Sequence, residues 1–306
     1  MTFFLGIDGG GTKTRCVLGD EQSVLASGSG SGCNVLRVGE ACARDSLAGA
    51  IHEACVQGGV SPQQISRTCA GISGAADDGV ASLVQRLLIE IIGGAIEVIG
   101  DMEIALESAF GGEPGIVIIA GTGAIAYGRN SRGETARASG WGRMVSDEGS
   151  GHWIGVQAIG AALRSYDAGK QTPLLRALLE ALDAKTVHDL VVRVNGSPAP
   201  DFAALFPVVL AVAEDGDKLA AEVLERAGGE LARTVATLVQ RLFSNGETQV
   251  AMHGGVILGS DRVRISFAHA LHEFSPRATL SEVEVDPALG ALQRARREFG
   301  IWHKRG

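Results

Sequence analysis

The chain has 306 residues, 45% of them hydrophobic and 20% charged, a composition typical of a globular protein that excludes a disordered or fibrous one. A chain of this length exceeds what one hydrophobic core usually organises, so two domains are expected. The formal net charge of −8 excludes the overall basic surface that nucleic-acid binding requires, so any affinity for phosphate must be local.

Cysteine usage and the N-terminus bear on the cellular compartment. The cysteines are odd in number, lie in the first quarter of the chain and show no C-x-x-C spacing: Cys16, Cys33, Cys42, Cys55 and Cys69. We expect them to be reduced and buried. The N-terminal sequence MTFFLGIDGG lacks a basic segment before its apolar residues, and no apolar run reaches the length of a membrane span. We therefore expect a cytoplasmic protein with no membrane partner.

The first 110 residues predict the element order βββαβαβα. Apolar and β-branched runs indicate strands at 3–8, 14–18, 23–27, 67–72 and 96–99. Helical periodicity indicates helices at 39–57, 78–92 and 102–110. The first three strands should form an antiparallel meander.

The second half repeats this plan after a turn at 111–114. Strands are expected at 115–120, 124–129 and 134–138. Helices then follow at 149–167, 172–182, 201–213 and 217–243, before a strand at 249–253 and a final βα segment. The extra helices are insertions into the plan of the first half.

A glycine-rich turn joins the first two predicted strands. It comprises Asp8, Gly9, Gly10, Gly11, Thr12 and Lys13. The chain contains neither a P-loop nor a G-x-G-x-x-G string, and this motif lies between two strands. Consecutive glycines allow the backbone to approach a phosphate, Thr12 adds a hydroxyl, and Asp8 can hold Mg²⁺ directly or through water. The alternative is a glycine hairpin without a ligand.

A second glycine turn occupies the same place in the second half. Gly121, Thr122 and Gly123 follow the opening strand of that half. Such a string also occurs in ordinary turns, so its position carries the argument. Two such hairpins, facing each other, can grip one phosphate chain.

Asp101 ends an apolar strand and opens a predicted helix. The ordinary interpretation is a helix N-cap, for which Asp is favoured. In a chain with two phosphate-binding turns, a carboxylate here can orient a hydroxyl nucleophile and accept its proton. We expect Asp101 to be the catalytic base and to contact the substrate.

A polar segment with flanking glycines, GWGRMVSDEGS, leads into the helix expected at 149. Its two acids suit either a helix start or hydrogen bonds to adjacent sugar hydroxyls. The candidate sugar-binding residues in this segment are Asp147 and Glu148, with Trp141 shaping the loop.

A further glycine turn follows the strand expected at 249–253. Gly254 and Gly255 would let an adenine lie against the backbone, whereas His253 is expected to be structural. Asp286 precedes a proline and is expected to start a closing helix.

Together these motifs resemble the N-acetylglucosamine kinase branch of the BadF/BadG/BcrA/BcrD ATPase family, within the superfamily of sugar kinases, heat-shock chaperones and actin. DGGGTKT is similar to the phosphate-1 loop, GTGAIAYG to the phosphate-2 loop, HGGV to the adenosine element and GWGRMVSDEGSGHWIG to the sugar-kinase segment. The likeness spans essentially the whole chain. It implies an α/β fold of two ribonuclease H-like (actin-like ATPase) domains with a cleft between them. We place the domains at 1–110 and 111–306, with the last helix free to pack back on the first.

The resemblance also implies function. It makes Asp101 the general base and places Thr12 and Thr122 at ATP. The residues that it places at the sugar are Asn34, Gly140, Trp141, Gly142 and Asp147. The expected enzyme is an ATP- and Mg²⁺-dependent kinase that phosphorylates the 6-hydroxyl of an amino sugar, with N-acetylglucosamine the first candidate and glucosamine the second. A homodimer is also expected. Ala124 and Ile125 depart from the Ser-Asn pair of the vertebrate enzyme, which leaves the sugar open.

Other members of the superfamily are less compatible with the chain. Dehydratase activators of the same family bridge an iron–sulfur cluster with cysteines, but no cysteine here follows residue 69. A chaperone would need a peptide-binding domain for which there is no room, and a filament protein would be longer. The alternative that is not an active enzyme is a catalytically weak, sugar-binding regulatory protein built on the same fold. The chain shows no additional DNA-binding segment, which makes this alternative less favoured.

Overall fold

A computed structural model of the protein describes residues 1–303, and the side chains of residues 1–297. Its internal contacts divide the chain into two units. The first consists of Met1–Glu113 with the segment that begins at Val283, and the second of Pro114–Glu282. The division after residue 113 lies close to the expected one. The expected second domain, 111–306, differs at its end, because the whole segment from Val283 belongs to the first unit.

The first unit is built on a five-stranded sheet in the order β3-β2-β1-β4-β5. Its strands are β1 (Phe3–Gly9), β2 (Lys13–Gly19), β3 (Val24–Ser31), β4 (Ile65–Ile72) and β5 (Ala95–Gly100). The first three form the predicted antiparallel meander, and β4 and β5 run parallel to β1. The carboxyl ends of β1, β4 and β5 therefore lie at one edge of the sheet.

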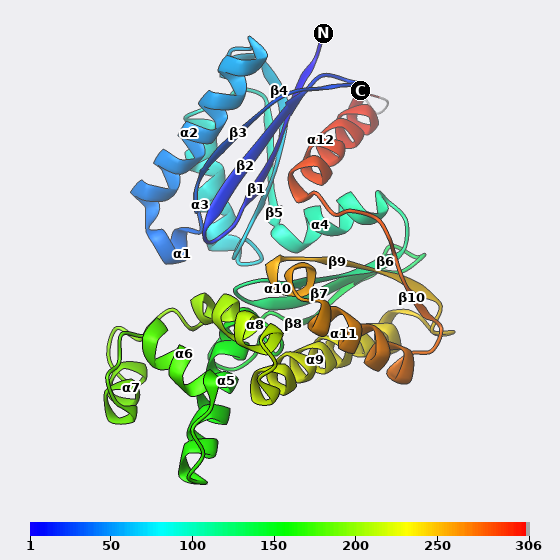
Figure 1. The fold of residues 1–306 in the computed structure, drawn as a ribbon. Helices are drawn as coiled ribbons and strands as arrows, with labels where there is room; N and C mark the ends of the chain where they lie inside the picture. The colour runs from blue at the N-terminus through cyan, green and yellow to red at the C-terminus, as the bar shows by residue number, and fades with distance from the viewer. Residues whose placement is uncertain (304–306) are drawn as a thin grey trace. The chain divides into compact units, whose positions relative to one another are not determined.

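Helices cover both faces of this sheet (Figure 1). They are α1 (Val35–Val38), α2 (Glu40–Gly58), α3 (Asp78–Ile89), α4 (Asp101–Phe110) and α12 (Pro287–His303), with a 3-10 turn at Pro62–Gln64. Alternation along β1 explains the two layers: Leu5 and Ile7 join the core beneath α2 and α3, whereas Phe4 joins the core beneath α12. A side chain at Gly6 would overlap the backbone at Ala288, so this glycine lets α12 approach β1 closely.

The second unit contains a sheet in the order β10-β9-β6-β7-β8. Its strands are β6 (Gly115–Ala120), β7 (Ala124–Arg129), β8 (Thr135–Ser139), β9 (Thr248–His253) and β10 (Ala278–Leu280). The β6–β7–β8 meander stands where β1–β2–β3 stands in the first sheet, and β9 runs parallel to β6 as β4 does to β1. The expected repetition of the first half is confirmed.

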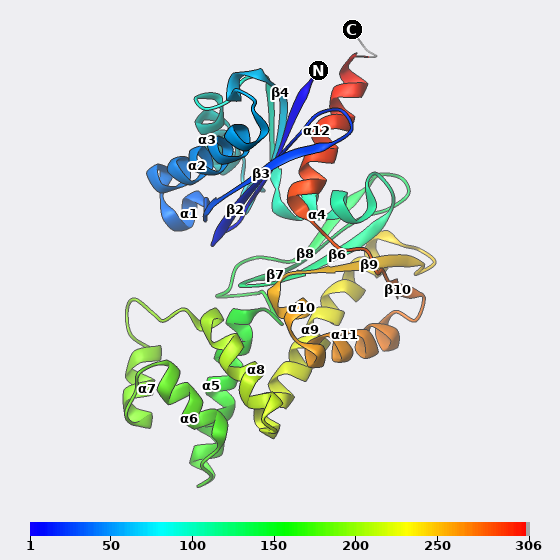
Figure 2. The ribbon, with the colours of Figure 1, turned by 45° about the horizontal axis from the view of Figure 1, so that its top comes forward.

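Most helices of the second unit are inserted between β8 and β9. They are α5 (Gly151–Asp167), α6 (Pro173–Ala181), α7 (Val187–Val194), α8 (Phe206–Glu214) and α9 (Lys218–Leu242), with a 3-10 turn at Phe202–Leu205; α10 (Gly255–Gly259) and α11 (Asp261–Phe274) follow β9. In both ribbon views α9 and α11 run side by side along one face of the sheet (Figures 1 and 2). Buried aliphatic side chains of α9 fill the core between them.

Several helices differ from the prediction. The sequence does not predict α1, α10 and α11, nor α7, although Thr186 and Asp189 form a capping box at the start of α7. The helix expected at 201–213 is a 3-10 turn followed by α8, because Pro207 has no amide hydrogen to donate to the carbonyl of Ala203.

All five cysteines are free and four are buried, but Cys42 is exposed on the outward side of α2, so its expected burial is wrong. Burial raises the pKa of the Cys16 and Cys33 thiols and keeps them protonated.

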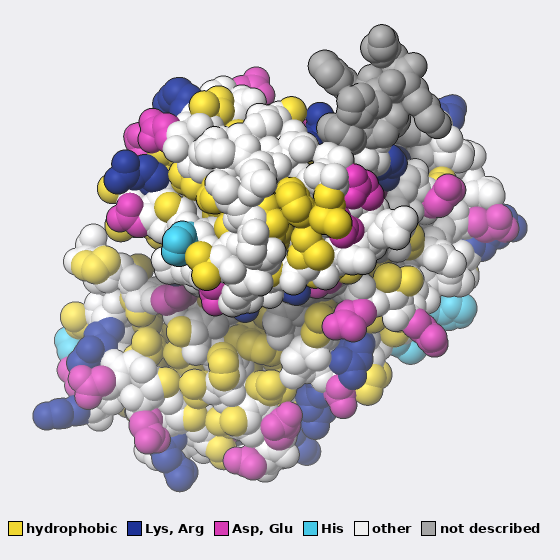
Figure 3. Space-filling model, turned by 90° about the horizontal axis from the view of Figure 1, so that it is seen from above, with side chains coloured by type: hydrophobic (Ala, Val, Ile, Leu, Met, Phe, Trp, Pro, Cys, Tyr) yellow, Lys and Arg dark blue, Asp and Glu magenta, His cyan; other side chains and the backbone are white. Residues whose placement is uncertain are grey.

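Within residues 1–303 no helix is long and apolar enough to cross a membrane. Figure 3 shows basic and acidic side chains interspersed over one face of the molecule.

Candidate active site

The carboxyl ends of three parallel strands in the first unit carry polar side chains. Asp8 lies near the end of β1, Ser73 follows β4, and Asp101 follows β5. The strand register aligns these ends, because Asp8 pairs with Gly71 and Ile72 pairs with Gly100. This edge is where parallel α/β sheets usually bind their ligands.

The glycine turn between β1 and β2 is held at the same edge by its backbone. The amide of Gly10 donates to the carbonyl of Lys13 at 2.9 Å and closes the turn. The amide of Cys33 donates to the carbonyl of Gly10 at 3.1 Å, and the amide of Ser73 to that of Gly9 at 2.9 Å. Loops after β3 and β4 thus fix the turn, while the side chains of Thr12 and Lys13 stay exposed.

Asp8 is partly buried in a region of negative charge. Burial, Asp101 and Asp286, in that order, raise its pKa from 3.8 to about 7, and Arg15 and Lys13 oppose the rise. Because burial and the two neighbouring carboxylates outweigh the two cations, the ionised form of Asp8 is disfavoured, and a ligand that brings positive charge would stabilise it.

Asp101 is the first residue of α4, and Gly100 occupies the N-cap position. The side chain of Glu103 accepts from the amide of Gly100 at 3.2 Å, so the cap does not depend on Asp101. The Asp101 carboxylate accepts from the amide of Met102 at 3.0 Å and from the hydroxyl of Ser73. Burial raises its pKa in spite of these hydrogen bonds. A partly buried carboxylate with a raised pKa at a strand end can act as a proton acceptor.

Asn34 follows β3 and lies at this edge as well. Its side chain is the N-cap of α1 and accepts from the amide of Leu36 at 3.0 Å. A side-chain carbon at Gly74 would lie 3.8 Å from Asn34 Nδ2, so the loop after β4 is its neighbour. The amide nitrogen of Asn34 therefore lies beside the loop that also supplies Ser73.

The second glycine turn, between β6 and β7, is held by the start of α5. The amide of Gly121 donates to the carbonyl of Gly123 at 2.9 Å. The amide of Gly151 donates to the carbonyl of Gly121 at 2.8 Å, and that of His152 to the carbonyl of Thr122 at 3.3 Å. The side chain of Thr122 is exposed. Both glycine turns predicted from the sequence thus follow the first strand of their sheet.

Asp147 connects this turn to the predicted sugar segment. It is 7% exposed, has a φ of 68°, and accepts from the amide of Gly142 at 3.3 Å and from the backbone of Gly140 and Ala124. A side-chain carbon at Gly123 would lie 2.7 Å from its Oδ2. Burial, with the charge of Glu148, raises the pKa of Asp147. The carboxylate orders the loop around itself.

The rest of the sugar segment lies on the surface. Trp141 is 66% exposed, and the guanidinium of Arg137 lies 3.9 Å above its ring. Gly140 has a φ of 73° and lies against Ile125. A side-chain carbon placed on Gly140 would lie only 2.6 Å from the side chain of Ile125. Ile125 therefore supports this segment by packing. Glu148 is partly exposed, and α5 begins at Gly151, two residues later than expected.

Gly254 lies against the end of β6. It has a φ of 101°, and a side chain there would overlap the backbone of Ala120. Gly255 begins α10 and has open space around it. The expected glycine turn is thus one residue followed directly by a helix.

Two residues at the edge of the first sheet, Ser73 and Asp286, are not predicted as site residues by the sequence. Ser73 was not recognised because a serine after a strand is a common loop residue. Asp286 was assigned only to a helix start, and its Oδ1 does accept from the amide of Leu289 at 3.1 Å. Its other oxygen binds Arg15 Nη1 at 2.6 Å, which ties α12 to β2 and adds negative charge near Asp8.

The site fits Mg²⁺ held by few protein ligands. Carboxylate oxygens are its preferred protein ligands, and Mg²⁺ bound with nucleotides commonly uses one or two carboxylates together with phosphates and water. Asp8 offers such a carboxylate in a negative environment. Among the described residues no group of three or more His, Cys, Asp or Glu side chains could hold an ion by itself.

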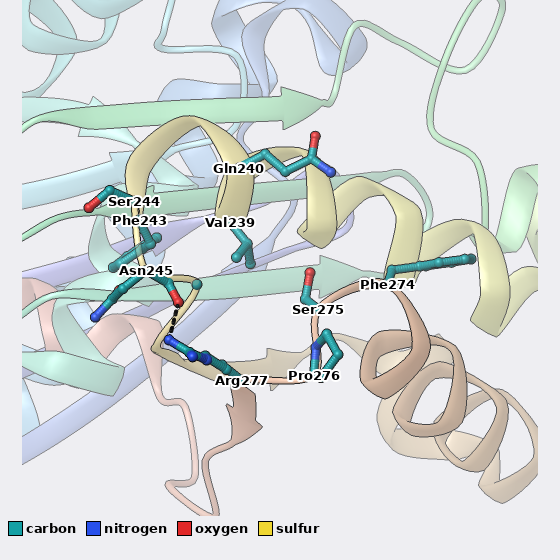
Figure 4. Close-up of a pocket in the computed structure, with 10 residues that line it drawn as sticks. Val239, Gln240, Phe243, Ser244, Asn245, Phe274, Ser275, Pro276 and Arg277 are labelled. Atoms are coloured by element: carbon teal, nitrogen blue, oxygen red, sulfur yellow. Dashed lines mark hydrogen bonds between the residues drawn. The ribbon is translucent and has the colours of Figure 1, made fainter.

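A cavity of about 520 Å³ lies elsewhere in the second unit, where α9 and α11 end (Figure 4). Phe243, Phe274 and Pro276 contribute apolar walls, and Arg277 Nη1 donates to the carbonyl of Asn245 at 3.2 Å. None of the predicted site residues lines it.

Two sheets of the same strand order, each with a glycine turn after its first strand, define the actin-like ATPase fold. The sequence matches the model of the BadF/BadG/BcrA/BcrD ATPase family over residues 5–295, and the chain belongs to this family. An N-acetylmuramic acid/N-acetylglucosamine kinase of Clostridium acetobutylicum is 32% identical over 97% of this chain and 99% of its own length. An N-acetyl-D-glucosamine kinase of Dictyostelium discoideum is 29% identical over 94% of this chain and 96% of its own.

A solved structure is similar over the same extent. A putative N-acetylglucosamine kinase of Chromobacterium violaceum superposes with a TM-score of 0.79 and 26% identity, over 95% of this chain and 98% of its own. The fold class expected from the sequence is confirmed.

Proposed function

We propose that this protein is an ATP-dependent kinase that transfers the γ-phosphate of ATP to a hydroxyl, the 6-hydroxyl, of an amino sugar. One observation carries the proposal: Asp101 lies at the same sheet edge as Asp8 and the first glycine turn, with a carboxylate that no helix cap requires. A phosphoryl-transfer enzyme needs such a base close to its phosphate-binding elements. The family and the named relatives support the same reaction class.

In this proposal each element has one task. Asp101 accepts the proton of the sugar hydroxyl, the freed oxygen bonds to the γ-phosphorus, and the bond from that phosphorus to the bridging oxygen of ADP breaks. Ser73 orients Asp101 through its hydroxyl. The turns at 9–12 and 121–123 hold the phosphates with backbone amides, and Gly254 and Gly255 accommodate the adenosine. Asp8 would hold Mg²⁺, which supplies charge neutralisation on the phosphates when bound.

N-acetylglucosamine is the favoured acceptor and glucosamine the second. Asn34 and Asp147 are the groups proposed to recognise the sugar, and a site built to hydrogen-bond a substituent rejects an analogue that lacks it. Glucose has only a hydroxyl at carbon 2 and should be a poor substrate. Ile125 makes the wall beside Gly140 apolar, which suits an acetyl methyl group.

We also propose that the protein is a homodimer.

A coupled ADP-release assay tests the proposal. The purified protein is supplied with ATP, Mg²⁺ and one of glucose, glucosamine or N-acetylglucosamine, and kcat/KM is compared. The kinase proposal expects turnover with an amino sugar that Asp101→Asn lowers by roughly 10²–10⁴-fold. Asp78→Asn is a matched control, because Asp78 is likewise the first residue of a helix, α3, but is exposed.

The alternatives give different results. A sugar-binding regulatory protein would bind the sugar calorimetrically and release no ADP. Glucose matching both amino sugars would contradict the proposed acceptor, and full activity in Asp101→Asn would contradict the assigned base.

A further inference from the structure

A cation on α1 lies against the first glycine turn. A side-chain carbon added at Gly11, in the middle of this turn, would lie 3.3 Å from Arg37 Nη1 and 3.6 Å from Arg37 Cδ. In both ribbon views α1 lies beside the turn between β1 and β2 (Figures 1 and 2). Arg37 is exposed, so its guanidinium is accessible to a ligand that the turn holds.

The chain that leads from β3 into α1 fixes this arrangement. A side-chain carbon at Gly32 would lie 2.3 Å from the carbonyl oxygen of Gly11, so the backbone after β3 packs directly on the turn. Asn34 caps α1, and its carbonyl accepts from the amide of Arg37 at 2.9 Å. Arg37 is therefore held beside the turn by a short, bonded stretch of backbone.

The charges at this edge of the sheet give such a cation a use. Asp101 and Asp286 both act on Asp8 as neighbouring negative charges, and a polyphosphate would meet repulsion from all three carboxylates. Arg15 is already engaged, because its Nη1 binds Asp286 at 2.6 Å. Arg37 adds positive charge on the side of the turn that faces α1.

The position of Arg37 along α1 indicates which phosphate it would meet. One helical turn separates it from Asn34, the residue proposed to recognise the sugar, and its guanidinium lies at the turn proposed to hold phosphate. The phosphoryl group that a kinase transfers lies between the acceptor sugar and ADP. The planar guanidinium carries paired N–H donors that match two oxygens of one phosphate group.

We propose that Arg37 binds the γ-phosphate of ATP and is a further catalytic residue of this kinase. Its charge and its paired donors stabilise the phosphoryl group while that group passes from ADP to the sugar oxygen. Asp101 still accepts the proton, so Arg37 takes part in no bond-making step. The inference rests on the function proposed above and deepens it, because it names a cation that selects ATP over ADP.

Nucleotide binding without sugar isolates the contact. A non-hydrolysable ATP analogue, ADP and AMP are titrated calorimetrically, with Mg²⁺ present, into the wild type, Arg37→Met and Arg37→Lys. We expect Arg37→Met to weaken the ATP analogue by roughly tenfold and to leave ADP and AMP within about twofold. With an amino sugar and ATP, kcat should fall roughly 10²-fold in Arg37→Met. Arg37→Lys should recover part of both losses, because lysine keeps the charge without the paired donors.

Arg44→Met is the matched control. Arg44 is an arginine of the neighbouring helix α2 with a 54% exposed side chain, and its replacement should change neither affinity nor turnover. Equal losses for all three nucleotides in Arg37→Met would show that Arg37 only shapes the turn and would overturn the proposal. Unchanged affinity for the ATP analogue together with unchanged kcat would also overturn it and leave the kinase standing. A loss confined to the ATP analogue, in a protein that phosphorylates no sugar, would retain the γ-phosphate contact and reject the kinase.

Discussion

Replacing Asp8 by asparagine should stabilise the folded protein at pH 8, although we expect it also to abolish the proposed Mg²⁺-dependent turnover. Burial, Asp101 and Asp286 raise the pKa of Asp8 from 3.8 to about 7. The folded protein thus binds this proton more tightly than the unfolded chain does. The contribution of Asp8 to stability therefore falls as the pH rises from about 4 to about 7 and stays low above that range. A pKa rise of this size corresponds to about 4 kcal/mol above pH 7.

The variant removes this penalty but also loses the attraction between Asp8 and the cations Arg15 and Lys13. We expect Asp8→Asn to raise the free energy of unfolding by roughly 2–4 kcal/mol at pH 8, and by less than about 1 kcal/mol at pH 4. Added Mg²⁺ should stabilise the wild type and not the variant.

Urea unfolding followed by circular dichroism at both pH values, without Mg²⁺, measures the effect. Asp45→Asn serves as the control, because the Asp45 side chain is 75% exposed. A gain of the same size at pH 4 and pH 8, or no gain at pH 8, would refute the electrostatic reasoning.

Three further predictions concern the base and the glycine turns. The activity that depends on Asp101 should decline as the pH falls through the raised pKa of the Asp101 carboxyl group, because a general base must be ionised to accept a proton. A pH–rate profile of kcat measures this decline, and a flat profile would contradict the prediction. Gly254→Ala should lower the free energy of unfolding by roughly 1–3 kcal/mol, because the added methyl group overlaps the backbone of Ala120. Gly255→Ala should change it by less than about 0.5 kcal/mol, because open space surrounds that position. Chemical unfolding measures both values, and equal effects would contradict the packing argument. Gly121→Val should keep the melting temperature, because open space surrounds this position, and weaken nucleotide binding by about tenfold in titration calorimetry; unchanged affinity would remove the second turn from the site.

The sequence predicted the sheet elements because their signals are local. Runs of apolar and β-branched residues mark β1 and β6, and the two glycine turns lie where the strings DGGGTKT and GTG occur. The helices are less predictable, because α7 is short and its main local signal is the capping box at Thr186, and because the break before α8 depends on the single residue Pro207. Asp101 was identified correctly as a helix-opening acid, but only the structure shows that Gly100 takes the N-cap position.

What the tertiary structure alone decided are the contacts between distant parts of the chain. Asp286 reaches Arg15 across 271 residues, and Ser73 reaches Asp101 because β4 and β5 pair in one register. The pKa of Asp8 depends on the carboxylates of Asp101 and Asp286, and no local sequence pattern indicates how close these two residues lie to Asp8. The glycine turns and candidate acids were therefore readable from the sequence, since backbone conformation is a local property. The proton affinity of Asp8 was not, because burial and charge depend on which segments the fold brings together.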